Sequence, residues 1–340
     1  LPPNLIDIAT LNLSPLYNNY SVHELVTGTT EVYSRSNDNS IIFNVLTTQG
    51  DGRLYEIVPV QLASGNKSYL YNETFTVNDT IYANDTLIVG TGVTLTFSNG
   101  SSLINHGTMI IQGTEQQPVS LNFVQPNGSN GLHNYGTLEM NYTMVSNASI
   151  GISNSDASLN VNSSVIHNNT TGISSTRTGA SETQDLSILN SEFYLNGTGI
   201  MTSQAAGTIM DNKFYCNDYG LVLTNNTVIT FGDNAMQGNN CIYDNSIGVL
   251  VNGSMPVIGS NGQDWVGGNN SISGNGVWDC LIINYSSVLA ENNFWDTRAI
   301  MVDRTSSASF QPEIYRDPCG QTGSSLMVRG GEGKQKLKQN

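Results

Sequence analysis

A short phrase that recurs along the middle of the chain limits what this sequence can fold into. It spans residues 143–296 and reads asparagine, an apolar or aromatic residue, a polar gap, asparagine, then glycine with an aliphatic pair. Successive glycines of the phrase are separated by 21, 27, 21 and 28 residues, and they are Gly151, Gly172, Gly199, Gly220 and Gly248. A step in the twenties with variable insertions is typical of one turn of a solenoid.

Each copy of the phrase predicts a short β-strand that is stable only when it is stacked. Val165 with His167, and Phe193 with Leu195, show the period of two that is typical of a strand. Strands this short bury little surface alone, but copies stacked ~4.8 Å apart satisfy each other's backbone groups. Asparagines before the glycines suit the corners, because Asn tolerates left-handed backbone and bonds to the same side chain in neighbouring turns. The sequence therefore predicts an all-β fold, a right-handed parallel β-helix.

The repeated phrase, closed by Glu-Asn-Asn-Phe-Trp-Asp at residues 291–296, resembles the right-handed parallel β-helix repeat proteins of the pectin-lyase-like superfamily. Residues 88–123 resemble the usual opening of these proteins, with a Gly-Val-x-Leu turn, an Asn-x-Gly-Thr turn and a Pro before an apolar strand. The resemblance covers residues 76–317. It implies the fold and leaves the activity open, because the superfamily includes lyases, hydrolases, adhesins and structural surface proteins.

Segments without the repeat flank the predicted β-helix. Residues 1–66 are expected to form an N-terminal β segment that caps the open end of the helix or docks onto a partner, because an uncovered end pairs with other strand edges. Within it, a Gln-Gly-Asp-Gly turn between residues 40–48 and 53–62 predicts a hairpin. Residues 67–318 are assigned to the β-helix and residues 319–340 to a basic C-terminal tail.

The two ends of the predicted β-helix have different chemistry. Its first turns are expected to place one row of apolar residues inward, namely Phe75, Val77, Ile81, Leu87, Val89, Val93 and Leu95. The C-terminal tail carries four of the 12 Lys and Arg residues, and we expect it to contact an acidic neighbour, either this body or a second copy. These candidate assembly residues are Arg329, Lys334, Lys336 and Lys338.

The charge composition favours some partners over others. Only 11% of the 340 residues are charged, and the net charge is −15. Nucleic-acid binding needs clustered cations, so no nucleic-acid partner is expected. No apolar stretch approaches the ~18 residues of a membrane helix, so no membrane-spanning segment is expected. The chain begins with Leu1 rather than Met, which fits a secreted protein whose signal peptide has been removed and predicts an extracellular or cell-surface location.

Four cysteines predict two disulfides and an oxidising compartment. Cys216 and Cys241 lie 25 residues apart, about one turn of the solenoid, and are expected to pair across adjacent turns. Cys280 lies near the position that glycine fills in the other copies, and is expected to join the last turn to Cys319. The sequence has no Cys-x-x-Cys and no nearby histidine pair, which disfavours a metal site at the cysteines.

Asn-x-Ser/Thr sequons occur eighteen times, about twice as often as composition alone gives. Two interpretations stay open, because asparagine-rich turns produce sequons without any modification, whereas N-glycosylation at several sites would give a secreted glycoprotein. The candidate sites are Asn12, Asn19, Asn66, Asn72, Asn78, Asn84, Asn99, Asn127, Asn141, Asn147, Asn162, Asn168, Asn169, Asn196, Asn225, Asn252, Asn269 and Asn284.

The sequence lacks the catalytic motifs that the resemblance implies. Pectate-lyase-like enzymes use carboxylates around calcium with a catalytic Arg or Lys, and polygalacturonase-like enzymes need clustered Asp with Gly-His-Gly and Arg-Ile-Lys. The chain has no Asp-Asp, Gly-His-Gly or Arg-x-Lys, and Arg177 and Lys213 are the main cations of the repeat region. Lyase chemistry on an acidic sugar also needs positive charge. The chain is therefore predicted not to be an enzyme, with no catalytic residue, metal ligand or cofactor assigned.

Three sets of side chains have a binding interpretation beside a structural one. We interpret Asp211, Asp218 and Asp244 as solvated turn carboxylates. The alternative is that they bind a structural calcium ion. We interpret the aromatic residues Tyr194, Phe214, Tyr215 and Tyr243 as members of core and surface ladders. The alternative is that they form a stripe on which sugars stack. The histidines His23, His106, His133 and His167 are scattered along the chain. His106 and His133 could lie on adjacent turns, where we favour a turn residue and an exposed strand residue over the alternative of a metal site.

Three functions remain open from the sequence. The first is a secreted, glycosylated structural subunit of a filament or surface layer, in which copies of the chain stack end to end without needing any special residue. The second is a cell-surface adhesin or glycan-binding module that contacts surface glycans through loop aromatics such as Trp265. The third is a polysaccharide lyase or hydrolase whose motifs have been lost or moved. The repeat, the flanking segments and the low charge favour the first.

Overall fold

The structure is a computed structural model whose described part consists of strands and turns. It divides into two compact units, Leu1–Ser68 with Asn84–Leu87, and Tyr69–Ala83 with Ile88–Asn340. Within the described part, no helix is long and apolar enough to cross a membrane. The described residues are 5–12, 17–25, 29–34, 40–47, 55–62, 66–98, 100–124, 130–178, 186–232, 237–260, 267–295, 299–311, 314 and 317–319.

The N-terminal unit contains two small antiparallel sheets. In one, β1 (Leu5–Asn12) pairs with β4 (Ser40–Thr47). In the other, β2 (Tyr17–Glu24) lies between β3 (Thr29–Ser34) and β5 (Tyr55–Leu62). The predicted hairpin between β4 and β5 is therefore wrong. A turn signal indicates where a strand ends, but the pairing partner is chosen by contacts that are distant in sequence.

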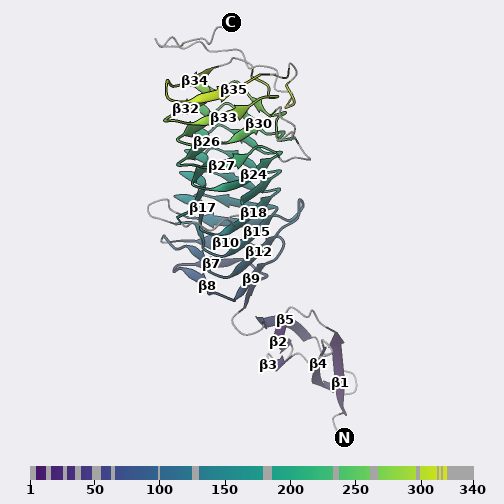
Figure 1. Cartoon of the computed structure of the whole chain (residues 1–340). Coiled ribbons are helices and arrows are strands. Elements are labelled where there is room, and N and C mark those ends of the chain that lie inside the picture. Colours follow the sequence, from purple (N-terminus) through teal and green to yellow (C-terminus); the bar gives the residue numbers. More distant parts are fainter. Residues whose placement is uncertain are drawn as a thin grey trace. The chain divides into compact units, whose positions relative to one another are not determined.

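Three parallel sheets run the length of the second unit (Figure 1). Sheet 1 consists of β7 (Glu73–Phe75), β10 (Thr94–Phe97), β13 (Val119–Phe123), β16 (Thr143–Ser146), β19 (Val165–His167), β22 (Glu192–Tyr194), β25 (Lys213–Tyr215), β28 (Cys241–Tyr243) and β31 (Ser271–Ile272). Sheet 2 consists of β8 (Asp79–Ile81), β11 (Leu103–Asn105), β14 (Leu132–Asn134), β17 (Ile150–Ser155), β20 (Thr171–Thr176), β23 (Thr198–Ser203), β26 (Tyr219–Thr224), β29 (Ile247–Asn252), β32 (Trp278–Ile283) and β34 (Ile300–Val302). Sheet 3 consists of β6 (Lys67–Tyr69), β9 (Thr86–Val89), β12 (Thr108–Gln112), β15 (Thr137–Asn141), β18 (Ser158–Asn162), β21 (Leu186–Leu189), β24 (Ala206–Met210), β27 (Val228–Thr230), β30 (Val257–Gly259), β33 (Ser287–Ala290) and β35 (Ser307–Ser309).

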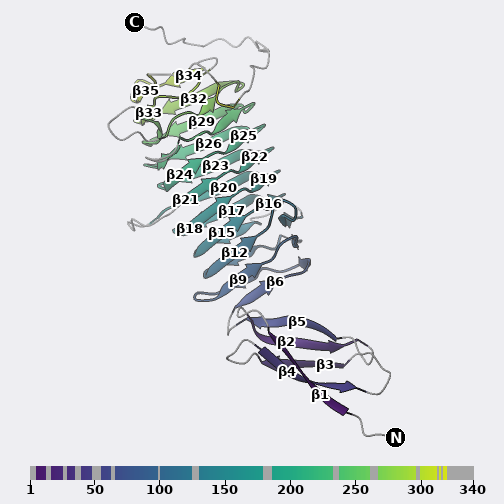
Figure 2. The same ribbon diagram turned by 90° about the vertical axis from the view of Figure 1, so that its right-hand side faces the viewer.

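Each full turn contributes one strand to each sheet, in the order sheet 1, sheet 2, sheet 3. Parallel strands joined by such crossovers form a right-handed coil. Figure 2 shows the strands of sheet 2 stacked between those of the other two sheets. The all-β fold class and the right-handed parallel β-helix predicted from the repeat are confirmed.

The core of the β-helix is built from columns of apolar side chains along its axis. In sheet 1 the middle residues of β19, β22, β25 and β28 are in register, and all are 0% exposed: Ile166, Phe193, Phe214 and Ile242. The rings of Phe193 and Phe214 stack with their centroids 4.8 Å apart. Each buried side chain of this size stabilises the fold by ~1.5–3 kcal/mol. The predicted inward row at the first turns is largely confirmed, but Val77 is 72% exposed.

Close approach of successive turns explains the repeating glycine. A Cβ atom on Gly199 would lie 2.5 Å from the carbonyl oxygen of Gly220, closer than real Cβ atoms come to backbone. The other glycines of the phrase meet the carbonyl of the following turn in the same way. In the last copy Asp279 follows Gly248 in this position, and Cys280 pairs with Val249. The prediction that Cys280 lies near the glycine position is confirmed, because Cys280 is the residue directly after it.

A buried ladder of amide side chains runs along the corner between sheets 1 and 2. Each Nδ2 donates to the Oδ1 of the next turn over 2.9–3.2 Å, through Asn169, Asn196, Asn217, Asn245 and Asn275. The ladder ends where the Nδ2 of Asn275 donates to Oδ1 of Asp279. All six residues are buried, so the ladder satisfies backbone and side-chain groups that water does not reach.

The corner residues with left-handed backbone are the ones just before the ladder asparagines. They have φ between 53° and 56° and are Asn168, Leu195, Cys216 and Asp244. The predicted stacking of corner asparagines is confirmed, whereas the left-handed position is occupied by four different residue types. A second buried ladder follows the corner between sheets 3 and 1, through Asn212, Asn240, Asn270 and Asn293.

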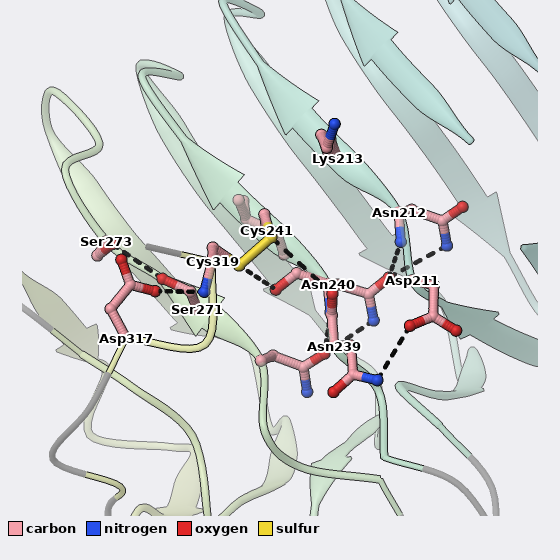
Figure 3. Close-up of a disulfide and its surroundings, with 12 residues drawn as sticks. Asp211, Asn212, Lys213, Asn239, Asn240, Cys241, Ser271, Ser273, Asp317 and Cys319 are labelled. Atoms are coloured by element: carbon pink, nitrogen blue, oxygen red, sulfur yellow. Dashed lines mark hydrogen bonds between the residues drawn. A yellow bond between two sulfur atoms is a disulfide. The ribbon is translucent and has the colours of Figure 1, made fainter. Parts of the chain in front are cut away.

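One disulfide joins the C-terminal segment to sheet 1. Cys319 bonds to Cys241 of β28, with their Cα atoms 5.9 Å apart (Figure 3). Cys216 and Cys280 are free thiols, so the predicted pairs Cys216–Cys241 and Cys280–Cys319 are wrong. Cys241 is in register with Lys213, three residues before Cys216, and Cys280 points into the core with 0% exposure. Two residues separated by about one turn of the solenoid lie on adjacent turns, but this spacing does not place them at the same position along their strands.

Candidate functional site

Four successive strands of sheet 1 present rings on its outer face. Each of β19, β22, β25 and β28 is three residues long with a buried middle residue, so its first and third side chains point outward. The third residues are in register and form what we call the ring column: His167, Tyr194, Tyr215 and Tyr243. The phrase repeat therefore builds one row of rings along the helix axis.

The rings of the column stack on one another. Their centroids are 5.1, 5.1 and 5.4 Å apart in chain order, and neighbouring planes are inclined by 16° or less. All four side chains are half-buried. Because each inner ring has its faces covered by its neighbours, a ligand lying along the column meets ring edges and phenol hydroxyls.

An ion pair lies beside the ring column, on the first residues of two of the strands. The Nζ of Lys213 lies 2.8 Å from Oε1 of Glu192, and 53% of the lysine side chain is exposed. The hydroxyl of Tyr215 donates to Oε2 of the same glutamate at 3.2 Å. We call the ring column with Glu192 and Lys213 the sheet 1 site. Its cation and carboxylate neutralise each other, which leaves the site without a net charge.

The local environment fixes the protonation states of the sheet 1 site. The hydrogen bond to Glu192 raises the pKa of Lys213 against the opposing effect of burial. Burial, with the charge of Glu192 adding to it, raises the pKa of Tyr215, and burial also raises that of Tyr243. Burial lowers the pKa of His167. At neutral pH the site therefore offers the Lys213 ammonium group, the neutral phenols of Tyr215 and Tyr243 and the neutral imidazole of His167.

His167 differs from the tyrosines of the column in its hydrogen bonding. Both of its ring nitrogens are buried and have no hydrogen-bond partner among the described residues. Its imidazole stacks on Tyr194 on one side, and Ser146 is the residue in register with it on the preceding turn. Protonating this imidazole would place a charge where it has no acceptor, so the ring acts as an apolar end to the column.

Sequence reasoning identified part of this site. The favoured interpretation of these aromatics as core and surface ladders is confirmed, because Tyr194, Tyr215 and Tyr243 stack on the outer face and Phe214 stacks on Phe193 in the core. Phe214 therefore cannot belong to an outward stripe. His167 and Glu192 were not connected with the stripe. The signal was available in the aligned strand sequences VIH, EFY, KFY and CIY. In each of them the middle residue is apolar and the third residue carries a ring.

The other residues considered for metal binding lie apart. Asp211 accepts a hydrogen bond from Nδ2 of Asn239 at 3.0 Å, as a turn carboxylate does. His106 stacks on Tyr135 at 4.9 Å, whereas His133 is in register with Ile104 and so does not face His106. In the ranges that the structure describes, no group of three or more His, Cys, Asp or Glu residues is arranged to hold a metal ion. The structural calcium ion considered for Asp211, Asp218 and Asp244 stays a prediction.

Burial separates the candidate glycosylation sites. Exposed side chains are Asn72, Asn78, Asn84, Asn147, Asn168, Asn225 and Asn284. Half-buried side chains are Asn66, Asn141, Asn162, Asn252 and Asn269. Asn169 and Asn196 are buried members of the ladder, whose Nδ2 groups are already donors. Asn12 and Asn19 lie in β1 and β2, where their side chains are not described, and Asn99 and Asn127 lie outside the described residues.

Several other predicted residues lie outside the described part of the chain. These are the loop aromatic Trp265 and the assembly candidates Arg329, Lys334, Lys336 and Lys338. Their roles in glycan contact and in assembly therefore stay predictions.

Comparisons with known proteins give a fold likeness only. No protein-family model matches the chain, and no curated protein matches it. Among solved structures, the Azotobacter vinelandii mannuronan C-5 epimerase AlgE6 A-module is 13% identical, with a TM-score of 0.31, and the match covers 72% of this chain and 90% of that one. The catalytic domain of a GH87 alpha-1,3-glucanase in complex with nigerose is 11% identical, with a TM-score of 0.27 and coverage of 90% and 91%.

These matches correct the prediction that the chain is not an enzyme, because the matched chains are an epimerase module and a catalytic domain of a glucanase. The prediction relied on missing pectate-lyase and polygalacturonase motifs. Their absence excludes only enzymes that need those motifs, since one fold supports many chemistries. At these TM-scores the matches carry no argument for a particular reaction of this chain.

Proposed function

We propose that the protein is an extracellular β-helix protein that binds an extended polysaccharide along the sheet 1 site. The observation that carries this proposal is the ring column, in which four half-buried rings stand in register beside an ion pair. Phenol hydroxyls, an ammonium group and a carboxylate are the groups that hydrogen-bond to sugar hydroxyls, and ring edges supply apolar contact to the sugar ring.

The spacing of the column supports a chain-like ligand over a compact one. Successive rings are 5.1–5.4 Å apart. In an extended pyranose chain each sugar advances by about the same length as one β-helix turn, which is ~4.8 Å. A polysaccharide lying parallel to the axis would therefore place one sugar beside each ring, and the same contact would be repeated on four turns.

The electrostatics favour an uncharged polysaccharide. Lys213 is paired with Glu192, so the sheet 1 site has no unpaired cation to hold a uronate. The whole chain carries a net charge of −15, which repels a polyanion at a distance. A neutral glycan avoids both effects and can use Lys213 and Glu192 as hydrogen-bonding groups.

The disulfide supports an extracellular location, because such bonds persist in oxidising compartments. Glycan binding would serve a cell-surface adhesin, and it is also the first step of a polysaccharide-active enzyme. End-to-end assembly into a filament stays a prediction, because the tail residues proposed for it lie outside the described part of the chain.

Binding to a panel of neutral polysaccharides, followed by affinity electrophoresis or calorimetry, tests the proposal. Tyr215→Ala removes one ring from the middle of the column, and we expect at least a tenfold loss of affinity, ~1.4 kcal/mol. Tyr215→Phe keeps the stack and removes only the hydroxyl, and should lose less. The control is Tyr82→Ala, an outward tyrosine with 67% exposure that is distant from the column in sequence. Equal binding by all three variants would refute the proposal.

A further inference from the structure

The C-terminal segment runs back along sheet 1 towards the ring column. Its Ile314 donates a backbone N–H to the carbonyl of Asn293 at 3.2 Å. Further on, Cys319 is bonded to Cys241, which lies two turns before Asn293 in the corner ladder. The segment therefore crosses the outer face of sheet 1 against the direction in which the β-helix grows. We call its described residues, Ile314 and 317–319, the strap.

The strap covers the turn that follows the ring column. Ser271 of β31 is in register with Cys241, and its hydroxyl lies 3.2 Å from that of Ser273 on the same side of the strand. Although both serines are on the outer face, they are only 2% and 5% exposed. Figure 3 shows Asp317 of the strap lying against them. On the ring column itself, by contrast, 53% of the Lys213 side chain is exposed.

At the other end of the ring column the outer face continues as a row of small polar residues. Before His167 this row consists of Ser146, Asn122 and Thr96, which are in register from turn to turn. Small side chains leave room above the strands for a ligand that extends past the rings. The ring column therefore has an open end at His167 and a closed end at Tyr243, next to the strap.

We propose that the sheet 1 site binds the terminus of a neutral polysaccharide, with the last sugar beside Tyr243 and against the strap. The proposal rests on glycan binding at sheet 1 and adds where the bound chain must stop. A chain that advances one sugar per turn of ~4.8 Å would place its next sugar over Ser273, where the strap lies. An internal stretch extends in both directions and meets the strap, whereas a chain end fits and leaves over His167.

The disulfide is the main attachment of the strap at the closed end. The N–H of Cys319 donates to Oδ1 of Asp317 at 2.9 Å, which shapes the strap internally without joining it to sheet 1. Breaking the bond between Cys319 and Cys241 should therefore release the strap and uncover the two serines of β31. The opened site would accept internal stretches as well as chain ends, so a reducing environment would widen its specificity.

Calorimetry with end-blocked oligosaccharides tests the proposal. The probes are six-sugar β-1,4-glucans and β-1,3-glucans, either free, coupled to 2-aminobenzamide at the reducing end, or closed by a benzylidene acetal at the non-reducing end. We expect one block to lower the affinity about tenfold and the other to leave it unchanged. In the double variant Cys241→Ser with Cys319→Ser the harmful block should lose its effect. The control Cys216→Ser, which alters a thiol outside the disulfide, should behave as the unmodified chain does.

Two measurements without any glycan accompany the binding data. Circular dichroism shows that the double variant is folded, and hydrogen exchange of the peptide containing Ile314 should become faster when the strap is released. Reduction of the unmodified chain with a phosphine should give the same opened state without a substitution.

Four results would overturn the proposal. They are equal binding of free and blocked glucans, equal weakening by both blocks, a harmful block that stays harmful in the double variant, and a strap that remains protected from exchange without its disulfide. Failure of every free glucan to bind is a different result. It would refute glycan binding at sheet 1 itself, and the recognition of chain ends would fall with it.

Discussion

Removing one amide from the buried ladder tests how the β-helix is held together. Oδ1 of Asn217 accepts from the backbone N–H and from Nδ2 of Asn196, at 2.9 and 3.2 Å. Its Nδ2 donates to the carbonyl of Phe193 at 3.0 Å and to Oδ1 of Asn245 at 2.9 Å. Asn217→Ala removes these four bonds at a site that is 4% exposed. Each is worth ~0.5–1.5 kcal/mol, so we expect a loss of about 4 kcal/mol.

The matched control is Asn160→Ala, which alters an exposed outward residue in the middle of β18. Surface substitutions of this kind change stability by less than ~0.5 kcal/mol. Urea unfolding of both variants, followed by circular dichroism and tryptophan fluorescence, gives the two changes in free energy. A ladder that merely fills space would make Asn217→Ala cost less than ~1 kcal/mol, and that result would refute the reasoning.

Three further predictions concern single positions. Gly199→Ala should lower stability by about 3 kcal/mol or more, because its Cβ would meet a carbonyl at 2.5 Å, whereas Gly276→Ala, with nothing closer than 3.6 Å, should be near neutral; urea titrations compare them. If the overlapping sequon pair is modified, glycopeptide mass spectrometry should find the sugar on exposed Asn168 and none on buried Asn169. The lowered pKa of His167 means that the folded state binds its proton less readily than the unfolded chain. Stability should therefore be complete above pH ~6.5 and decline as the pH falls below it, and His167→Phe should flatten this dependence in melts at pH 5 and 7.5.

The sequence predicts the fold well because the repeat has one physical cause at every turn. The glycine is needed where turns approach, the corner asparagines stack, and the middle residues of the strands alternate inward, so one copy of the phrase explains the others. Val77 shows where this reasoning fails. Alternation alone places it inside, but it follows β7 in the turn before β8 and is 72% exposed, because strands of three residues end before the alternating pattern does.

The site was harder to predict, because its residues are related by register rather than by sequence distance. Tyr194 and Tyr215 are 21 residues apart, and Tyr215 and Tyr243 are 28 apart, yet each pair stacks. The disulfide illustrates the same difficulty. A separation of 25 residues suggested Cys216 with Cys241, but register places Cys241 opposite Lys213, and its partner is Cys319, 78 residues away. The position of each residue within its strand decides such contacts. A prediction must therefore give the strand register without an error of even one residue.

Binding of a neutral oligosaccharide series of increasing length tests the account most directly. The four rings of the column lie on successive turns, one beside each expected sugar. Calorimetry should show affinity rising with each added sugar and levelling off at about four, because the turns on either side of the column have Ser146 and Ser273 at this position instead of rings. Affinity that is already complete with a single sugar, or no binding by any length of a polysaccharide panel, would contradict a chain lying along sheet 1.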